Sequence, residues 1–217
     1  IRSIGATILV LIWMTARKIP IFEKDRSLFW GLFAGILFSI EFILIYWGLE
    51  FTHACRAVIF LNTSPFIVAL GAQLFIPGDK LKKPQVLGLL LAFLGIIIAF
   101  SESLNMPTRQ MLIGDIMLLG AAIIWGATTV VIKATVLSSI APSKTLLYQL
   151  GVSAFILPAA SILMGEQGII SLTLQGGLSL IYQTLWVAFV TYIAWFWLIS
   201  NYAVSKMASF TFLTPLF

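Results

Sequence analysis

A pattern that occurs twice, 150 residues apart, sets the strongest limit on the fold. The first copy, residues 52–66, reads THACRAVIFLNTSPF, and the second, residues 202–216, reads YAVSKMASFTFLTPL. Each copy places a basic residue, Arg56 or Lys206, nine positions before a proline, with an apolar run between them. A proline inside a helix removes a backbone donor, so a membrane span tolerates it only where protein or a cavity satisfies the freed carbonyl. The repetition therefore predicts that the chain builds the same broken helix twice.

The composition indicates a membrane protein. Hydrophobic residues make up 60% of the chain and charged residues only 10%, whereas a soluble chain of this length is far more polar. Runs of roughly twenty apolar residues alternate with short charged links, which is typical of helices that cross a bilayer. The net charge of +5 could suggest nucleic acid, but the basic residues lie in the links, where a membrane protein places them. We expect the lipid bilayer as a partner and no nucleic acid.

Eight apolar segments have the length and composition of membrane spans. They cover approximately residues 1–16, 28–49, 54–76, 85–101, 113–133, 145–164, 178–199 and a segment that starts near 203. The links between them are too short to hold a soluble domain.

The repeat predicts how these spans are organised. Under the 150-residue shift, the sixth, seventh and eighth spans match the first, second and third. The fourth and fifth spans have no match, which predicts one more helix before residue 1 and another after residue 217 in a parent protein. We therefore expect an all-α polytopic membrane protein with two inverted five-helix repeats: ten helices in the parent and about eight here. The repeats are placed at residues 1–101 and 113–217, and residues 102–112 form the loop between them.

Loop charges predict the orientation. If the links at 17–27, 77–84, 134–144 and 200–206 are cytoplasmic, ten of the 13 basic residues, Lys144 and Lys206 among them, face the cytoplasm. Cytoplasmic loops favour Lys and Arg, so this orientation is preferred to its inverse.

The chain resembles the drug/metabolite transporter superfamily, EamA type. The resemblance rests on Trp125-Gly126 in the first helix of a repeat and on two segments, EFILIYWGLEFTHACRAVIFLNTSPFIVAL and LISNYAVSKMASFTFLTPLF, that carry the repeated pattern. One departure is Gly78-Asp79-Lys80, where the family often has Gly-Glu-Arg. The resemblance implies a ten-helix carrier of small metabolites in a bacterial cytoplasmic (inner) membrane, often an exporter of amino acids or related compounds.

Seven residues are candidates for the substrate or proton pathway: Glu41, Asn62, Ser64, Pro65, Trp125, Thr214 and Pro215. Glu41 is the sharpest candidate, because a carboxylate inside a span is costly unless it is protonated, paired or in a wet cavity. A purely structural hydrogen bond is the alternative.

The polar residues before Pro65 leave two interpretations open. Asn62, Thr63 and Ser64 could line the pathway, or they could bond only to the local backbone. Arg56 and Lys206 are expected to anchor their helices by extending to the lipid headgroups. Asp115, near the start of its span, suits the helix dipole there.

We expect a secondary transporter that works by alternating access between the repeats, with proton coupling left open, and not an enzyme. One His and one Cys, His53 and Cys55, provide neither a nucleophile with its base nor a Cys/His metal site, and no Gly-rich phosphate loop is present. No cofactor is expected. A passive channel or a purely structural membrane protein remains the alternative.

Overall fold

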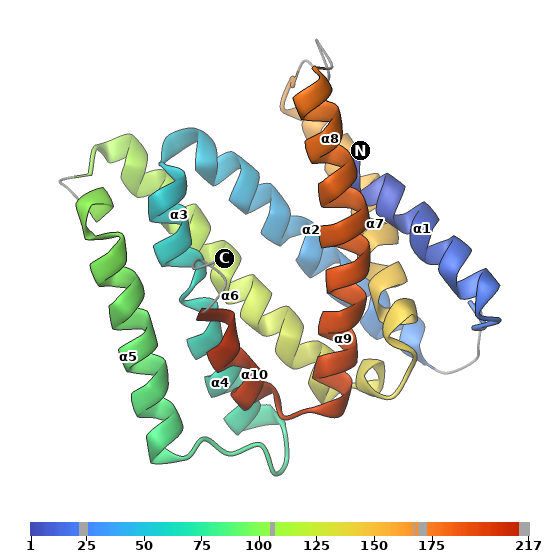
Figure 1. Ribbon diagram of the computed structural model, residues 1–217, viewed down its shortest axis with the longest axis horizontal. Coiled ribbons are helices and arrows are strands. Elements are labelled where there is room, and N and C mark those ends of the chain that lie inside the picture. The colour runs from blue at the N-terminus through green and yellow to red at the C-terminus, as the bar shows by residue number, and fades with distance from the viewer. Residues whose placement is uncertain (22–25, 105–106, 167, 169–172, 213–217) are drawn as a thin grey trace. The chain divides into compact units, whose positions relative to one another are not determined.

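The computed structural model describes residues 1–21, 26–104, 107–166, 168 and 173–212. Figure 1 shows that every regular element within these ranges is a helix. The elements are α1 (Arg2–Ala16), α2 (Ser27–Phe51), α3 (Ala54–Leu61), α4 (Ser64–Phe75), α5 (Lys83–Ala99), η1 (Ser101–Leu104), α6 (Arg109–Ala134), η2 (Val136–Ser138), α7 (Pro142–Leu163), α8 (Leu174–Tyr182), η3 (Gln183–Thr191), α9 (Tyr192–Asn201) and α10 (Val204–Phe210). The elements η1 and η2 are 3₁₀ turns, and η3 is π-helical.

The all-α prediction is confirmed, and the predicted spans correspond to these helices. Within the described residues, five segments have the length and composition to cross a membrane: α2, α3 with α4, α6, α7, and the continuous α8–η3–α9. The helices α1 and α5 are apolar but shorter, and α10 begins where the eighth segment was expected. The chain is therefore a multi-pass membrane protein.

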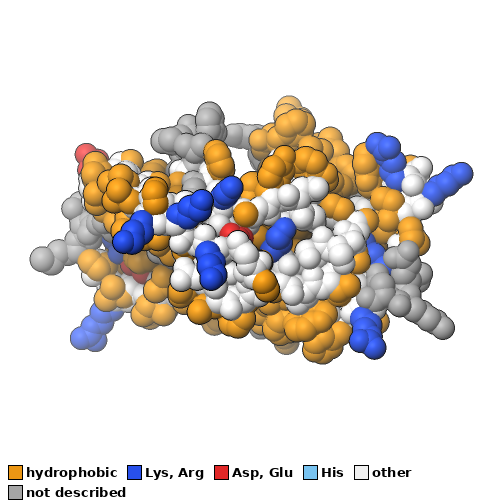
Figure 2. All heavy atoms as spheres, turned by 90° about the horizontal axis from the view of Figure 1, so that it is seen from below, with side chains coloured by type: hydrophobic (Ala, Val, Ile, Leu, Met, Phe, Trp, Pro, Cys, Tyr) orange, Lys and Arg blue, Asp and Glu red, His pale blue; other side chains and the backbone are white. Residues whose placement is uncertain are grey.

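Large hydrophobic side chains are exposed along the helices. On α1, Ile4, Ile8 and Ile12 are exposed at four-residue spacing, which marks one face of the helix. Hydrophobic side chains also make up much of the surface in Figure 2, and Lys and Arg appear there only in separate places. Such extensive apolar exposure is expected for helices surrounded by lipid.

Contacts divide the chain into two compact units, and each draws on both halves of the sequence. Unit 1 contains Ile1–Ser39 and Thr135–Asn201, and unit 2 contains Ile40–Ala134 and Tyr202–Phe217. The helix α2 contributes its first part to unit 1 and the rest to unit 2.

In unit 1, small residues allow α2 to approach α7 closely. A Cβ atom at Gly31 would lie 2.3 Å from the ring of Tyr148, and one at Gly35 would lie 2.7 Å from Val152. The Ser27 and Tyr148 hydroxyls are 2.9 Å apart and form a hydrogen bond. The helix α1 packs against α7 and η3, where Gly5 meets the methyl group of Thr184.

In unit 2, α4 and α3 pack against α6, and α10 packs against α4 and α5. The core between these helices contains the aromatic rings of Phe66, Phe93 and Phe212. Phe66 and Phe93 meet edge to face, with ring centroids 5.2 Å apart, a favoured aromatic geometry. Unit 2 holds the described part of both copies of the repeated pattern.

Candidate functional site

The predicted broken helix is present in the first copy of the pattern. The helix α3 ends at Leu61 and α4 begins at Ser64, so the apolar segment 54–75 forms two helices. Pro65 lies in the first turn of α4, where a helix has no intrahelical use for the N–H that proline lacks. Ser64 and Pro65 are both buried. The break therefore lies within packed protein, one of the settings in which irregular backbone is tolerated at membrane depth.

Two polar residues of the break bond to the backbone of the preceding turn. Asn62 Nδ2 donates to the Val58 carbonyl at 2.7 Å, and Thr63 Oγ1 donates to the Phe60 carbonyl at 2.6 Å. The same two carbonyls also accept the backbone N–H groups of Asn62 and Thr63, each at 3.1 Å, so each side chain adds a second hydrogen bond to its carbonyl. Asn62 and Thr63 thus make the local backbone bonds of one interpretation, and lining of the pathway stays a prediction.

The helix α6 packs directly against the break through Gly126. A Cβ atom there would lie 2.6 Å from Ile67 Cβ and 3.2 Å from the Ser64 carbonyl oxygen, so only glycine fits without movement. The neighbouring Trp125 is half-buried. Trp125 therefore lies on α6 one residue before the position that packs against the break.

The register of α2 places Glu41 near the same level. A Cβ atom at Gly48 would lie 3.2 Å from the Gly114 carbonyl oxygen, and Leu44 lies 3.6 Å from the Cβ position of Gly120. At this contact α2 and α6 therefore run in opposite directions. Glu41, 5% exposed, follows one turn beyond Leu44 toward the part of α6 that packs against the break. Glu41, the break and Trp125 thus lie in one unit and at one level along α6.

A buried polar cluster lies at the start of α3. Arg56 forms an ion pair with Asp115 of α6, and its Nε donates to Asp115 Oδ1 at 3.1 Å. Thr52 Oγ1 donates to the same carboxylate oxygen at 3.0 Å, and Arg56 Nη1 donates to the Ser103 carbonyl at 2.8 Å. We call Thr52, Arg56, Ser103 and Asp115 the Asp115 cluster. Two donor nitrogens of the guanidinium meet the two carboxylate oxygens, a strong and directional arrangement.

The Asp115 cluster corrects two expectations. Arg56 does not extend to the headgroups as an anchor: its side chain is 4% exposed and ion-paired. Asp115 was expected to interact with the helix dipole at the start of its span, but it lies in the second turn of α6 and is the partner of a buried cation. Sequence reasoning missed the pair because the partners are 59 residues apart. A signal was available, since Asp115 is the one acidic residue within the apolar segment 110–132.

A second polar contact joins Asp79 to the start of α10. Asp79 lies in the link after α4, and it accepts hydrogen bonds from the Ser205 backbone N–H at 3.2 Å and from the Ser205 hydroxyl. We call Asp79 and Ser205 the Asp79 cluster. Both residues are buried, whereas the adjacent Lys206 is exposed. Gly78-Asp79-Lys80, which stands where the family often has Gly-Glu-Arg, thus supplies a carboxylate that meets the second copy.

The remaining candidates fall into three groups. Thr214 and Pro215 lie outside the described residues. Lys144, counted above among the loop cations, is the third residue of α7 and only 2% exposed. The expectation that it lies in the link 134–144 is therefore wrong, because α7 begins at Pro142. His53 and Cys55 are exposed at the start of α3. Within the described ranges, no three His, Cys, Asp or Glu side chains gather to hold a metal ion.

Apolar helices long enough to cross a bilayer define an all-α, multi-pass membrane protein. The profile of the EamA-like transporter family matches residues 1–101 and again residues 112–217. The chain belongs to the EamA-like transporter family, within the drug/metabolite transporter superfamily. The family resemblance seen in the sequence is confirmed.

Two curated relatives agree with this assignment. An uncharacterized transporter of Archaeoglobus fulgidus is 23% identical over 84% of this chain and 61% of its own length. The uncharacterized transporter YoaV of Bacillus subtilis is 22% identical over 98% of this chain and 72% of its own length. The chain thus spans roughly two thirds of these relatives.

A solved structure shares the fold. A protein crystal structure superposes with a TM-score of 0.82 over 99% of this chain and 75% of that chain, at 14% identity. At this identity the likeness supports the fold alone.

Proposed function

We propose that the protein is a secondary transporter that moves small metabolites across a bacterial cytoplasmic membrane. Alternating access takes place between two inverted repeats, residues 1–101 and 113–217, joined by residues 102–112. The observation that carries this proposal is the buried break between α3 and α4, packed against α6 at the level of Glu41. Broken helices with polar groups at membrane depth are the usual way in which carriers build a binding site near the midplane.

The substrate class follows from the groups at this level. A carboxylate, the polar residues of the break and an aromatic ring suit a small molecule with an amino group, because the acid binds the ammonium and the ring adds a cation–π contact. Export of amino acids or related compounds fits this chemistry. Asn62 and Ser64 would act through the break that they shape, and Thr214 and Pro215 would contribute the matching element of the second repeat.

Proton coupling would act through Glu41. A buried carboxylate that exchanges a proton as the site changes its access would link substrate movement to the proton gradient. If an ammonium group binds the ionised form, proton and substrate compete for one group. Glu41 alone would then bind both the proton and the ammonium group of the substrate, because the second repeat has no matching acid.

Counterflow in proteoliposomes tests the proposal. The intact protein is reconstituted in vesicles loaded with a mixture of unlabelled amino acids, and uptake of the labelled mixture is followed. A carrier gives saturable uptake that rises when substrate is present on the far side. Uptake that does not saturate and does not depend on substrate inside the vesicles would instead support a passive channel. No uptake of any amino acid would exclude this substrate class.

Two prolines provide a matched pair for the helix break. Pro65→Ala removes the proline of the buried break, and Pro84→Ala removes an exposed proline from the equivalent first turn of α5. We expect the first variant to lower the exchange rate by about tenfold, as for the loss of one catalytic contact of about 1.4 kcal/mol, while the second transports normally. Equal exchange rates in the two variants would show that the proline of the helix break has no role in transport.

A further inference from the structure

Two buried carboxylates meet the starts of the two copies of the repeated pattern. Asp115 binds Thr52 and Arg56 beside the first copy, and Asp79 binds Ser205 in the second. In each case the acid and its donors come from different matches to the family profile. Asp115 and Ser205 belong to the second match, and the other three residues belong to the first.

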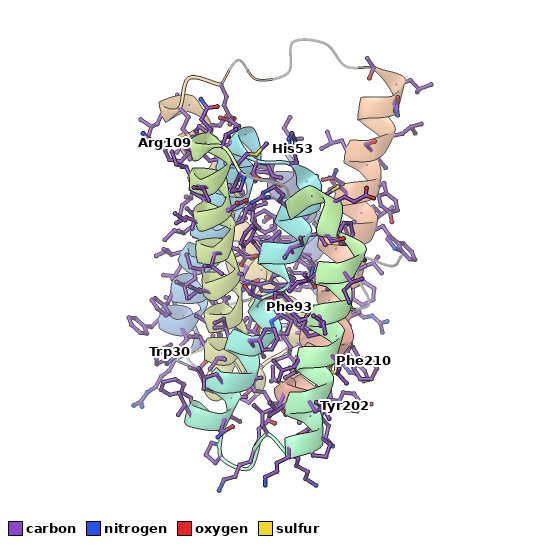
Figure 3. All side chains as sticks on the ribbon, turned by 90° about the vertical axis from the view of Figure 1, so that its left-hand side faces the viewer. Trp30, His53, Phe93, Arg109, Tyr202 and Phe210 are labelled. Carbon is purple, nitrogen blue, oxygen red and sulfur yellow. The ribbon has the colours of Figure 1, made fainter. Side chains whose placement is uncertain are left out.

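The two clusters lie at opposite ends of unit 2. In Figure 3, His53, beside the Asp115 cluster, is near one end of the helices, and Tyr202, beside the Asp79 cluster, is near the other. The segment 54–75 runs between the two ends. Twenty-two residues at about 1.5 Å each span roughly 33 Å, which is close to the thickness of the hydrocarbon core. Each cluster therefore joins the two halves of the sequence near one face of the membrane.

The clusters differ in their chemistry. The Asp115 cluster is a buried ion pair in which one guanidinium uses two donors on one carboxylate and a third donor on the Ser103 carbonyl. The Asp79 cluster consists of two hydrogen bonds from Ser205, and the neighbouring Lys206 remains exposed. Separating a buried ion pair leaves two charges without compensation, whereas separating a hydroxyl and an amide from a carboxylate leaves one.

We propose that these clusters are the two closing contacts of the transport cycle, and that their unequal strength sets which end of the protein opens in the absence of substrate. The Asp115 cluster holds its end closed, and the Asp79 end opens more readily. With the predicted orientation, the resting protein is thus accessible from the cytoplasm. Asp79 and Asp115 are positioning residues that hold helices and do not themselves contact substrate. The inference rests on the proposed alternating access.

Two buried alanines allow opening to be measured at each end. Ala57 lies next to Arg56 in α3, and Ala72 lies one turn from the end of α4, and both are buried. Each is replaced by cysteine, one at a time, in the intact protein carrying Cys55→Ser, since Cys55 is exposed. The rate of reaction with a small water-soluble methanethiosulfonate is followed in detergent, where the reagent reaches both ends.

The expected changes are opposite at the two ends. Asp115→Asn should raise the labelling rate of A57C by about tenfold, within the usual range of coupling between two states, and lower that of A72C. Asp79→Asn should raise the labelling rate of A72C by about threefold, as for the loss of hydrogen bonds without an ion pair. Thr52→Val and Ser205→Ala, which keep both carboxylates, should give smaller changes in the same directions.

Rescue separates the proposed role from simple destabilisation. The double variant Arg56→Asp with Asp115→Arg restores an ion pair and should return A57C labelling to a low rate. An equal increase at both ends after Asp115→Asn, or no change at either end, overturns the inference. Labelling does not depend on transport. If the labelling rates change in opposite directions at the two ends but the protein shows no counterflow, the proposed function is contradicted. If the protein transports but the labelling rates at the two ends change equally, only the role of the clusters is contradicted.

Discussion

The two copies of the repeated pattern place a cation at the same position and use it differently. In the first copy Arg56 is 3% exposed and is ion-paired with Asp115. In the second copy Lys206 is exposed, and the residue before it, Ser205, binds the carboxylate of Asp79. Equal spacing therefore gives two helices that begin alike. The position of the nearest acid decides whether the cation is buried.

The difference also fits the chemistry of the two cations. Arginine presents a planar fork that matches a carboxylate with two parallel hydrogen bonds, and it is the common choice for buried ion pairs. Lysine is a compact, strongly hydrated charge, better suited to an exposed position. Both copies thus carry a positive charge at the same position. Arginine occurs where this position is buried, and lysine where it is exposed.

The largest expected effect concerns the faces at which the two copies begin. His53 and Tyr202 are both exposed at the start of their copies, and the predicted orientation places them on opposite sides of the membrane. In intact cells, with Cys55→Ser as background, H53C should react completely with an impermeant thiol reagent and Y202C should not react. Both should react after permeabilisation. The same accessibility for both residues would mean that the copies are not inverted.

Next in size is the effect on the pH dependence of transport. Under the 150-residue shift Glu41 matches Thr191, whose hydroxyl bonds to the Val187 carbonyl at 2.6 Å. We expect Glu41→Gln, which resembles the protonated acid, to abolish the pH dependence of counterflow, while Thr191→Val preserves it. A Glu41→Gln variant with the original rate and pH profile would assign Glu41 a structural role.

Stability should distinguish the two cations directly. Arg56→Met leaves the Asp115 carboxylate buried without its cation, so the free energy of unfolding should fall by about 3–5 kcal/mol. Lys206→Met changes an exposed side chain and should cost less than about 0.5 kcal/mol. Unfolding in mixed detergent micelles can compare the two variants. Similar losses in the free energy of unfolding would show that Lys206 contributes to stability as much as Arg56 does, although its side chain is exposed.

The smallest effect concerns the packing behind the first copy. Gly126→Ala places a methyl group 2.6 Å from Ile67 Cβ, and the adjustment should cost about 1–3 kcal/mol of stability. Gly95→Ala in α5 meets nothing within 4 Å and should stabilise the helix by about 0.5–1 kcal/mol. The same unfolding measurement serves for both. A neutral Gly126→Ala variant would indicate that α6 can move away from the break.

Much of the fold could be predicted because it depends on local properties of the chain. The apolar runs predicted the helices, and Pro65 predicted the break before α4. The π-helical η3 was not predicted, since the apolar run that contains it has no feature that distinguishes it from an α-helix. The hydropathy of a segment fixes its length but not the hydrogen-bonding pattern inside it.

The site was predicted less completely, because it depends on which helices pack together and on which of their residues lie at the same depth. Glu41 could be selected as a buried acid from its span alone. The partner of Arg56 could not, since it lies on another helix and only the packing of α3 on α6 brings the two together. Lys144 shows the same limit: it was placed in the link 134–144, whereas the structure places it in α7, where tertiary packing buries it.

The sequence separation of Arg56 and Asp115 has a consequence for biosynthesis. The ribosome synthesises Arg56 59 residues before Asp115, which at 5–20 residues per second is a delay of roughly 3–12 s. Throughout that time the nascent helix α3 carries a cation whose carboxylate does not yet exist. The buried ion pair can therefore form only after the start of α6 has been synthesised. If the two halves were expressed as separate chains, Arg56 would lack this partner until the chains met.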